Sequence, residues 1–175
     1  MKKLLLLFVI LMSFNGFSQK FELTPQGFVD SEDHTKNYLV LEFPNKTKEE
    51  LFKETMIYLN KSYFSPQDII STVDNETITV SALSSTLIRA MISEFYNQYS
   101  ITFSFKDGKV KIDEPNVNLF NKKGYKLSIS NGNDNIFNKK GQVNYKRAKE
   151  GLELFAQKFV LSYKLAMSDE KNEDW

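Results

Sequence analysis

The chain has 175 residues and a nearly balanced charge, with 23 Lys plus Arg, 22 Asp plus Glu and a formal net charge of +1. Its 41% hydrophobic residues, including 15 Phe and 8 Tyr, are enough for a folded core and exclude an intrinsically disordered protein. The absence of cysteine from this sequence excludes disulfides, thiol catalysis, cysteine-based metal sites and a lipid-anchored lipoprotein.

Residues 1–18 have the layout of a secretory signal peptide. Two lysines precede an apolar run from Leu4 to Met12, and the small residues Gly16 and Ser18 predict cleavage after Ser18. The run is well below the roughly 20 apolar residues that a membrane-spanning helix needs. We therefore expect an exported protein, periplasmic or secreted, whose mature chain has no transmembrane segment and a net charge of −1.

Residues 19–35 are polar and of mixed charge, which predicts a flexible N-terminal segment. The segment contains His34, the only histidine of the chain, beside Glu32 and Asp33. A transition-metal site usually needs several nitrogen or sulfur ligands. We therefore interpret His34 as a solvated loop residue and predict no metal or cofactor.

A strand followed by a capped helix is predicted from residue 38 onwards. Apolar residues alternate over 38–43, and Pro44 ends the strand because it lacks a backbone donor. Thr47 and Glu50 have the spacing of a capping box, and apolar residues then recur at helical spacing. This pattern predicts a helix over 48–61 and gives the corner a structural role.

Two strands are predicted over 69–73 and 77–82, around the turn "VDNE". Residues 84–98 are ambiguous, because Leu87, Met91 and Phe95 fit helical spacing while a long edge strand is also compatible with the pattern. We favour a helix there.

The clearest hairpin lies between Tyr99 and Phe120, where "SITFSF" and "VKI" flank "KDGK". The pair Asp107-Gly108 is typical of a two-residue type I′ turn, in which both residues have positive φ. That turn pairs Phe105 with Val110, which places apolar residues together on one face of the hairpin.

The stretches "YLVLEFPNKTKEELF", "DNETITV" and "YSITFSFKDGKVKI" resemble a family of exported bacterial domains of unknown function with a TATA-binding-protein-like (TBP-like) fold. The resemblance covers residues 36–121 and implies an α+β fold with a curved antiparallel sheet and helices packed on one face. It supplies no catalytic residue. It also does not imply nucleic-acid binding, because the strand face of Ser100, Thr102 and Ser104 lacks the basic residues that contact DNA phosphates.

The C-terminal third is predicted to contain an Asn-, Gly- and Lys-rich loop region over 122–143, with a short strand at "YKLSI". An amphipathic helix over 144–167, capped by Asn144, is expected to pack on the domain and to precede a charged tail over 168–175. The stretch "NGNDN" at 131–135 has one carboxylate, so we interpret it as a turn and not as a calcium loop. We detect no internal repeat.

Charge is distributed unevenly along the chain. Residues 20–105 contain 7 basic and 12 acidic residues, whereas residues 106–150 contain 11 and 5. One hypothesis is that loop lysines contact an anionic partner, such as lipid head groups, polysaccharide or an acidic protein. The simpler interpretation is that the two segments pack together and that the lysines are solvated. The candidate anion contacts are Lys122, Lys123, Lys126, Lys139 and Lys140.

Three functions remain open from the sequence. The leading one is a non-catalytic binding or scaffolding domain of the bacterial envelope, because no catalytic residue set such as G-x-S-x-G is present. The first alternative is a carrier of a small apolar ligand between sheet and helix, which the abundance of Phe and Tyr would permit. The second is a carboxylate-based hydrolase, for which Glu42 and Asp113 are the residues to test.

Overall fold

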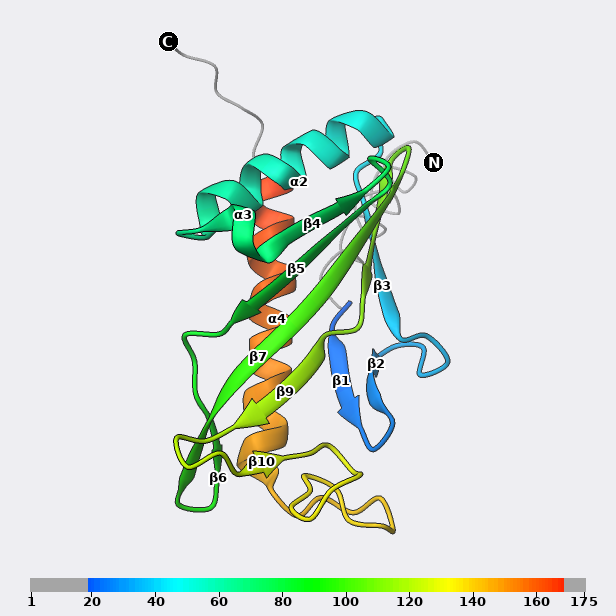
Figure 1. Ribbon diagram of the computed structural model, residues 1–175. Helices are drawn as coiled ribbons and strands as arrows, with labels where there is room; N and C mark the ends of the chain where they lie inside the picture. The colour runs from blue at the N-terminus through cyan, green and yellow to red at the C-terminus, as the bar shows by residue number, and fades with distance from the viewer. Residues whose placement is uncertain (1–18, 169–175) are drawn as a thin grey trace, which may run out of the picture.

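The computed structural model describes residues 19–168 and has an α+β architecture (Figure 1). An eight-stranded antiparallel sheet forms one layer, two helices form the second, and a separate two-stranded sheet lies beside them. The signal peptide expected at 1–18 and all of the tail after Ser168, including Trp175, lie outside the described residues. No helix within residues 19–168 is long and apolar enough to cross a membrane.

The main sheet has the strand order β10-β9-β7-β5-β4, with β8 and β3 continuing from β7 and β6 pairing with β7. The strands of the chain are β1 (Phe21–Thr24), β2 (Gly27–Asp30), β3 (Tyr38–Glu42), β4 (Ile70–Val73), β5 (Thr77–Leu83), β6 (Ile88–Ala90), β7 (Ser93–Lys106), β8 (Lys109–Asp113), β9 (Asn116–Phe120) and β10 (Lys126–Leu127). The helices are α2 (Lys48–Ser62), the single turn α3 (Pro66–Ile69) and α4 (Lys146–Ser168).

Strand β7 organises the sheet, because its 14 residues pair with β5 and β6 along one edge and with β8 and β9 along the other. Its side chains alternate strictly. Tyr99, Ile101 and Phe103 are buried, while Ser100 and Thr102 point to the opposite face. This alternation of period two gives the sheet one apolar face and one polar face.

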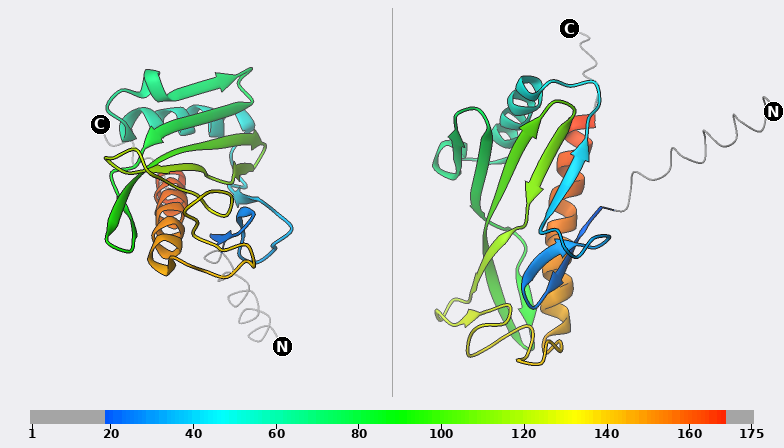
Figure 2. Two further views of the ribbon diagram at one scale, coloured as in Figure 1. Left: turned by 60° about the horizontal axis from the view of Figure 1, so that its bottom comes forward. Right: turned by 90° about the vertical axis from the view of Figure 1, so that its right-hand side faces the viewer.

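Both long helices cover the apolar face. The ring of Phe52 in α2 lies 5.5 Å from that of Phe105, and the ring of Tyr163 in α4 lies 4.9 Å from that of Phe103. Figure 2 shows α4 running behind the sheet along the length of the molecule, with α2 across one end. The predicted α+β fold with helices on one face of an antiparallel sheet is therefore confirmed.

The corner between β3 and α2 has the predicted capping box. The backbone N–H of Thr47 donates to the carboxylate of Glu50 at 2.8 Å, and the N–H of Glu50 donates to the Thr47 hydroxyl at 3.2 Å. The turn between β7 and β8 also packs here, because Asp107 accepts from the N–H of Lys48 and the N–H of Gly108 donates to the carbonyl of Lys46. These hydrogen bonds hold the β3–α2 corner against the β7–β8 turn.

The β7–β8 hairpin has the predicted register, with Phe105 opposite Val110 and Phe103 opposite Ile112. The predicted turn type is wrong. Gly108 has a φ of +71°, but Asp107 does not lie in the left-handed region, so the turn is not type I′. The contacts of Asp107 and Gly108 with the β3–α2 corner accompany this different backbone conformation.

The prediction of a flexible segment over 19–35 is wrong. Strands β1 and β2 form a hairpin there, and Phe21, Leu23 and Phe28 are buried in the core. The N–H of Leu23 donates to the carboxylate of Glu153 in α4 at 3.0 Å. Strands β1 and β2 have only four residues each, so their alternation is a short signal, and the hairpin gains its order from burial against α4.

The helix favoured over 84–98 is also wrong, because this segment forms β6 and the first part of β7. A two-residue turn of Met91 and Ile92 joins them, between the paired residues Ala90 and Ser93. Neither turn residue is a usual turn former. The segment therefore keeps the apolar spacing of a helix while its structure is a hairpin.

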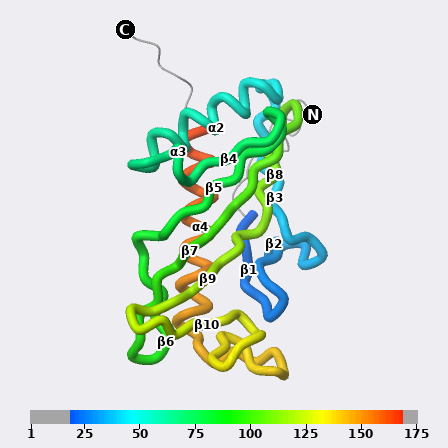
Figure 3. The backbone as a smooth tube through the Cα atoms, in the orientation of Figure 1, coloured from blue at the N-terminus to red at the C-terminus, as the bar shows by residue number. Residues whose placement is uncertain are grey.

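The region 122–143 is mostly loop, with β10 as the short strand inside "YKLSI". Figure 3 shows that this loop region, the β6–β7 hairpin and the start of α4 gather at the end of the molecule opposite α2. We call this end the basic end, and its residues are described below.

Candidate functional site

The basic end contains a five-residue sequence twice. Phe-Asn-Lys-Lys-Gly occupies residues 120–124 and recurs at residues 137–141. The expectation that the sequence contains no internal repeat is therefore wrong. Each copy has only five residues, whereas the units of repeat architectures have roughly 20–50 residues. The duplication is therefore a repeated turn and not a structural repeat.

The first copy forms a turn that its asparagine holds together. The side-chain oxygen of Asn121 accepts from the backbone N–H groups of Lys123 at 2.9 Å and Tyr125 at 3.0 Å. The Asn121 backbone N–H donates to the carbonyl of Tyr125, and the Gly124 N–H donates to the carbonyl of Asn121. Gly124 has a φ of +81°, which a side chain would strain. Lys122 and Lys123 lie at the exposed tip of the turn.

The second copy repeats this arrangement bond for bond. The side-chain oxygen of Asn138 accepts from the N–H groups of Lys140 at 2.9 Å and Gln142 at 3.0 Å. The Asn138 N–H donates to the carbonyl of Gln142, the Gly141 N–H donates to the carbonyl of Asn138, and Gly141 has a φ of +76°. Lys139 therefore lies at the exposed tip of its turn, as Lys122 does. We call the two copies the dilysine turns.

Each dilysine turn is anchored in the fold by its first residue, a phenylalanine. Phe120 ends β9, and its ring lies 5.6 Å from the ring of Tyr96 on the neighbouring strand. Phe137 is buried, and its N–H donates to the carbonyl of Ile129. The lysines thus extend from turns whose bases are fixed, which reduces the loss of backbone entropy when a partner binds.

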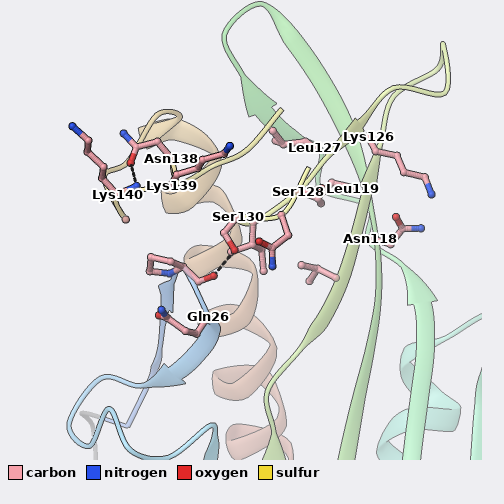
Figure 4. Close-up of a pocket in the computed structure, with 15 residues that line it drawn as sticks. Gln26, Asn118, Leu119, Lys126, Leu127, Ser128, Ser130, Asn138, Lys139 and Lys140 are labelled. Atoms are coloured by element: carbon pink, nitrogen blue, oxygen red, sulfur yellow. Dashed lines mark hydrogen bonds between the residues drawn. The ribbon is translucent and has the colours of Figure 1, made fainter. Parts of the chain in front are cut away.

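A cleft of about 1030 Å³ lies beside the second dilysine turn and brings together three of the five predicted lysines. Figure 4 shows Lys139 and Lys140 on one wall and Lys126 on the opposite wall, with Leu127 and Ser130 between them. The Ser130 hydroxyl donates to the carbonyl of Pro25 at 2.6 Å, which ties the loop to the β1–β2 turn. The unexpected N-terminal hairpin therefore shapes this cleft.

The other two predicted lysines, Lys122 and Lys123, line a second cleft of about 690 Å³. Arg147 from the start of α4 lines it as well, together with Met91 and Ile92 from the β6–β7 turn. The structure therefore divides the five lysines between two neighbouring clefts at one end of the molecule.

The charges of the dilysine turns are not neutralised by the chain. Among residues 19–168, none of the five predicted lysines forms an ion pair, and all five are exposed. Some lysines elsewhere are paired, as in the bridges of Lys46 to Glu54 at 2.6 Å and of Lys48 to Glu76 at 2.9 Å. Several unpaired ammonium groups at one end create a positive potential that attracts anions.

The other polar candidates, His34 and the "NGNDN" stretch, do not form a shared site in the described part of the chain. His34 lies 3.1 Å from Glu22 on the surface. The "NGNDN" stretch forms a turn in which the Asn135 amide donates to the carbonyl of Gly132. No group of three or more His, Asp or Glu residues that could hold a metal ion occurs in the described part of the chain.

Glu42 and Asp113, the residues proposed for testing hydrolysis, lie on the adjacent strands β3 and β8. Glu42 is opposite Lys109 and Asp113 is opposite Tyr38, so four residues along the pair separate them. At about 3.4 Å per residue this is on the order of 13 Å, beyond the roughly 5–9.5 Å that separates paired catalytic carboxylates. Each forms an ion pair with a lysine of β8.

The interface between sheet and helix, which the ligand-carrier alternative requires, is occupied by the chain's own side chains. The Tyr99 ring lies 4.8 Å from that of Phe155 and the Phe103 ring lies 5.9 Å from that of Phe159. These distances between ring centroids are typical of packed aromatic pairs. These four aromatic residues therefore belong to the packed core between sheet and helix.

No known family model matches the chain, and no curated protein matches its sequence. Two solved structures resemble its fold. A DUF4468 family protein from Bacteroides ovatus superposes with a TM-score of 0.61 at 12% identity, covering 78% of this chain and 87% of the other. A TBP-like protein from Parabacteroides distasonis gives 0.59 at 16% identity, covering 77% and 92%. The chain therefore has the TBP-like α+β fold of these bacterial proteins.

Proposed function

We propose that this protein is a non-catalytic, exported domain of the bacterial envelope that binds an anionic partner through its two dilysine turns. The observation that carries the proposal is the duplication. Two copies of one sequence, with matching hydrogen bonds around Asn121 and Asn138, present unpaired lysines at the same end of the molecule. The signal-peptide pattern of residues 1–18 supports export.

The chemistry of the turns favours binding over catalysis. A lysine ammonium that acts as a base or nucleophile is usually desolvated or beside another catalytic group. The lysines of the turns are exposed and hydrated, as expected for groups that meet phosphate, sulfate or carboxylate as point charges.

Binding to a soluble polyanion tests the proposal. Fluorescent dextran sulfate is titrated with the mature protein at about 0.05 M and about 0.5 M salt, which shortens the screening length severalfold. We expect binding that weakens at the higher salt. In the variant with Lys122, Lys123, Lys139 and Lys140 changed to Gln, affinity at low salt falls by at least about a hundredfold, since each basic residue near an anionic surface contributes roughly 1 kcal/mol.

A matched variant controls for net charge. Changing the exposed Lys53, Lys61, Lys106 and Lys158 to Gln removes the same charge from positions outside the two clefts. We expect this variant to keep most of its affinity. Equal losses in both variants, or binding that does not change with salt, would show that the dilysine turns have no specific part in binding.

A further inference from the structure

The turn between β6 and β7 exposes two large apolar side chains to water. Met91 is 74% exposed and Ile92 is 100% exposed. Met91 also has a φ of +53°, in the left-handed region. A two-residue hairpin turn that needs positive φ at its first position usually has glycine there, so this turn has both backbone strain and exposed apolar surface, neither of which stabilises the fold.

The surroundings of this turn are basic and aromatic. One cleft joins Met91 and Ile92 to Lys122 and Lys123 of the first dilysine turn. Arg147 and Tyr125, which is 64% exposed, line the same cleft. Figures 1 and 2 show the β6–β7 turn at the basic end, and the cleft that it shares with Lys122 and Lys123 places it beside the first dilysine turn.

We infer that the basic end docks on an anionic lipid bilayer, with Met91 and Ile92 inserted among the acyl chains and the dilysine turns on the lipid phosphates. The inference rests on the proposed function and names its partner. Lys and Arg bind anionic head groups, and Tyr favours the depth of the head groups. Apolar side chains gain by leaving water for hydrocarbon, and membrane attachment that combines an apolar insertion with a basic patch is stronger than either alone.

The apolar turn distinguishes the lipid from other anionic partners. A soluble polysaccharide has no hydrocarbon phase into which Ile92 could move. An acidic protein would need a complementary apolar pocket, whereas a bilayer receives any small apolar tip. Of the anionic partners considered, the bilayer therefore accounts for both the lysines and the exposed turn.

The variant Met91→Gly/Ile92→Asn tests the insertion. These residues suit the turn, since glycine relieves the strain at positive φ, so we expect the melting temperature to rise. Partitioning onto sedimented vesicles of equal parts phosphatidylglycerol and phosphatidylcholine is expected to fall about tenfold or more, because two large apolar side chains no longer leave water. Affinity for dextran sulfate is expected to stay unchanged.

A control variant changes equally exposed apolar residues at the other end. Phe64 is 104% exposed and Leu165 is 59% exposed, and we expect Phe64→Asn/Leu165→Asn to bind vesicles as the wild type does. Vesicles of phosphatidylcholine alone are expected to bind the wild type weakly, because the lysines have no anionic partner there.

A single label reports the depth of the turn directly. Because the sequence has no cysteine, Ile92→Cys gives one attachment site for an environment-sensitive fluorophore. We expect its emission to shift to the blue and to intensify on anionic vesicles, and the same label at Phe64→Cys to stay unchanged.

The results separate the two proposals. If the turn variant binds vesicles as tightly as the wild type and the label at position 92 stays in water, insertion is wrong while polyanion binding through the lysines still stands. If the wild type binds neither dextran sulfate nor anionic vesicles, the proposed function fails and the lipid inference fails with it.

Discussion

At the scale of single residues, side-chain oxygens that accept backbone N–H groups stabilise both the β3–α2 corner and the dilysine turns. Thr47 and Asn121 each use a side-chain oxygen to accept backbone N–H groups that have no other partner nearby. The capping box of Thr47 was predictable, because a Glu three residues after a Thr, just before an apolar helix, is a known signal. The role of Asn121 was not, because asparagine is common in loops and its acceptor geometry depends on the backbone.

Replacing Thr47 with Ala is expected to lower the free energy of unfolding by about 1 kcal/mol, because the N–H of Glu50 loses its acceptor. Urea denaturation monitored by circular dichroism gives the value. Thr86→Ala, an exposed position outside any helix, serves as the control and should change stability by less than about 0.5 kcal/mol. Loss of polyanion binding in a stably folded Thr47→Ala protein would instead assign the corner a part in binding.

At the scale of elements, local signals predicted some units and tertiary packing decided the others. Strand β3, helix α2 and the β7–β8 hairpin have their own turn and cap residues, so their sequences alone indicate them. The β1–β2 hairpin has Pro25 and Gly27 at its turn, but its strands have only four residues each, and β6 lacks turn residues altogether. Ile88 of β6 is buried where α4 has Gly151, a close approach that the sequence of either element does not reveal.

Glycine substitutions test the turns as elements. Gly108 and Gly124 both have positive φ, and alanine there is expected to cost about 1–2 kcal/mol of stability through backbone strain. A Cβ atom at Gly124 meets nothing within 4 Å, and one at Gly108 has only ordinary contacts, so the two costs should be similar. Chemical denaturation provides the comparison.

The control is Gly151→Ala inside α4, where alanine favours the helix by up to about 1 kcal/mol and a Cβ atom lies 3.4 Å from Ile88. If Gly108→Ala is no more destabilising than Gly151→Ala, strain at the β7–β8 turn is not significant for stability.

At the scale of the whole molecule, the two ends differ in character. The end with α2 has hydroxyl groups in the packed interior, such as the Tyr163 hydroxyl 2.7 Å from that of Thr55. The opposite end presents unpaired lysines and an apolar turn. The fold class was predictable from the element pattern and the resemblance. The convergence of residues 91, 122 and 139 at one end was not, because it depends on the path of the whole chain.

Alkaline pH is expected to unfold the protein cooperatively. Burial raises the pKa of Tyr63, Tyr99 and Tyr163 above the ordinary value of 10.0, and in Tyr63 the hydrogen bond to Tyr99 adds to the increase. Because the folded pKa is the higher one, the contribution of these phenols to stability is full below pH 10.0 and is lost as the pH rises above it. Phenolate absorbance and circular dichroism should therefore change together.

The variant Tyr163→Phe should show a smaller absorbance step on alkaline unfolding, since one buried phenol is missing. Complete ionisation of all eight tyrosines while the circular dichroism stays native would contradict the burial of these phenols.

Helix α4 connects the basic end to α2 along the length of the molecule (Figure 1). Its 23 residues span about 35 Å at 1.5 Å per residue. Two dilysine turns and one apolar turn give a docked molecule three points of support, and three separate points set its tilt as well as its height. The fold would then act as a rigid spacer, which holds α2 and the polar face of the sheet at a constant distance and orientation above the bilayer surface.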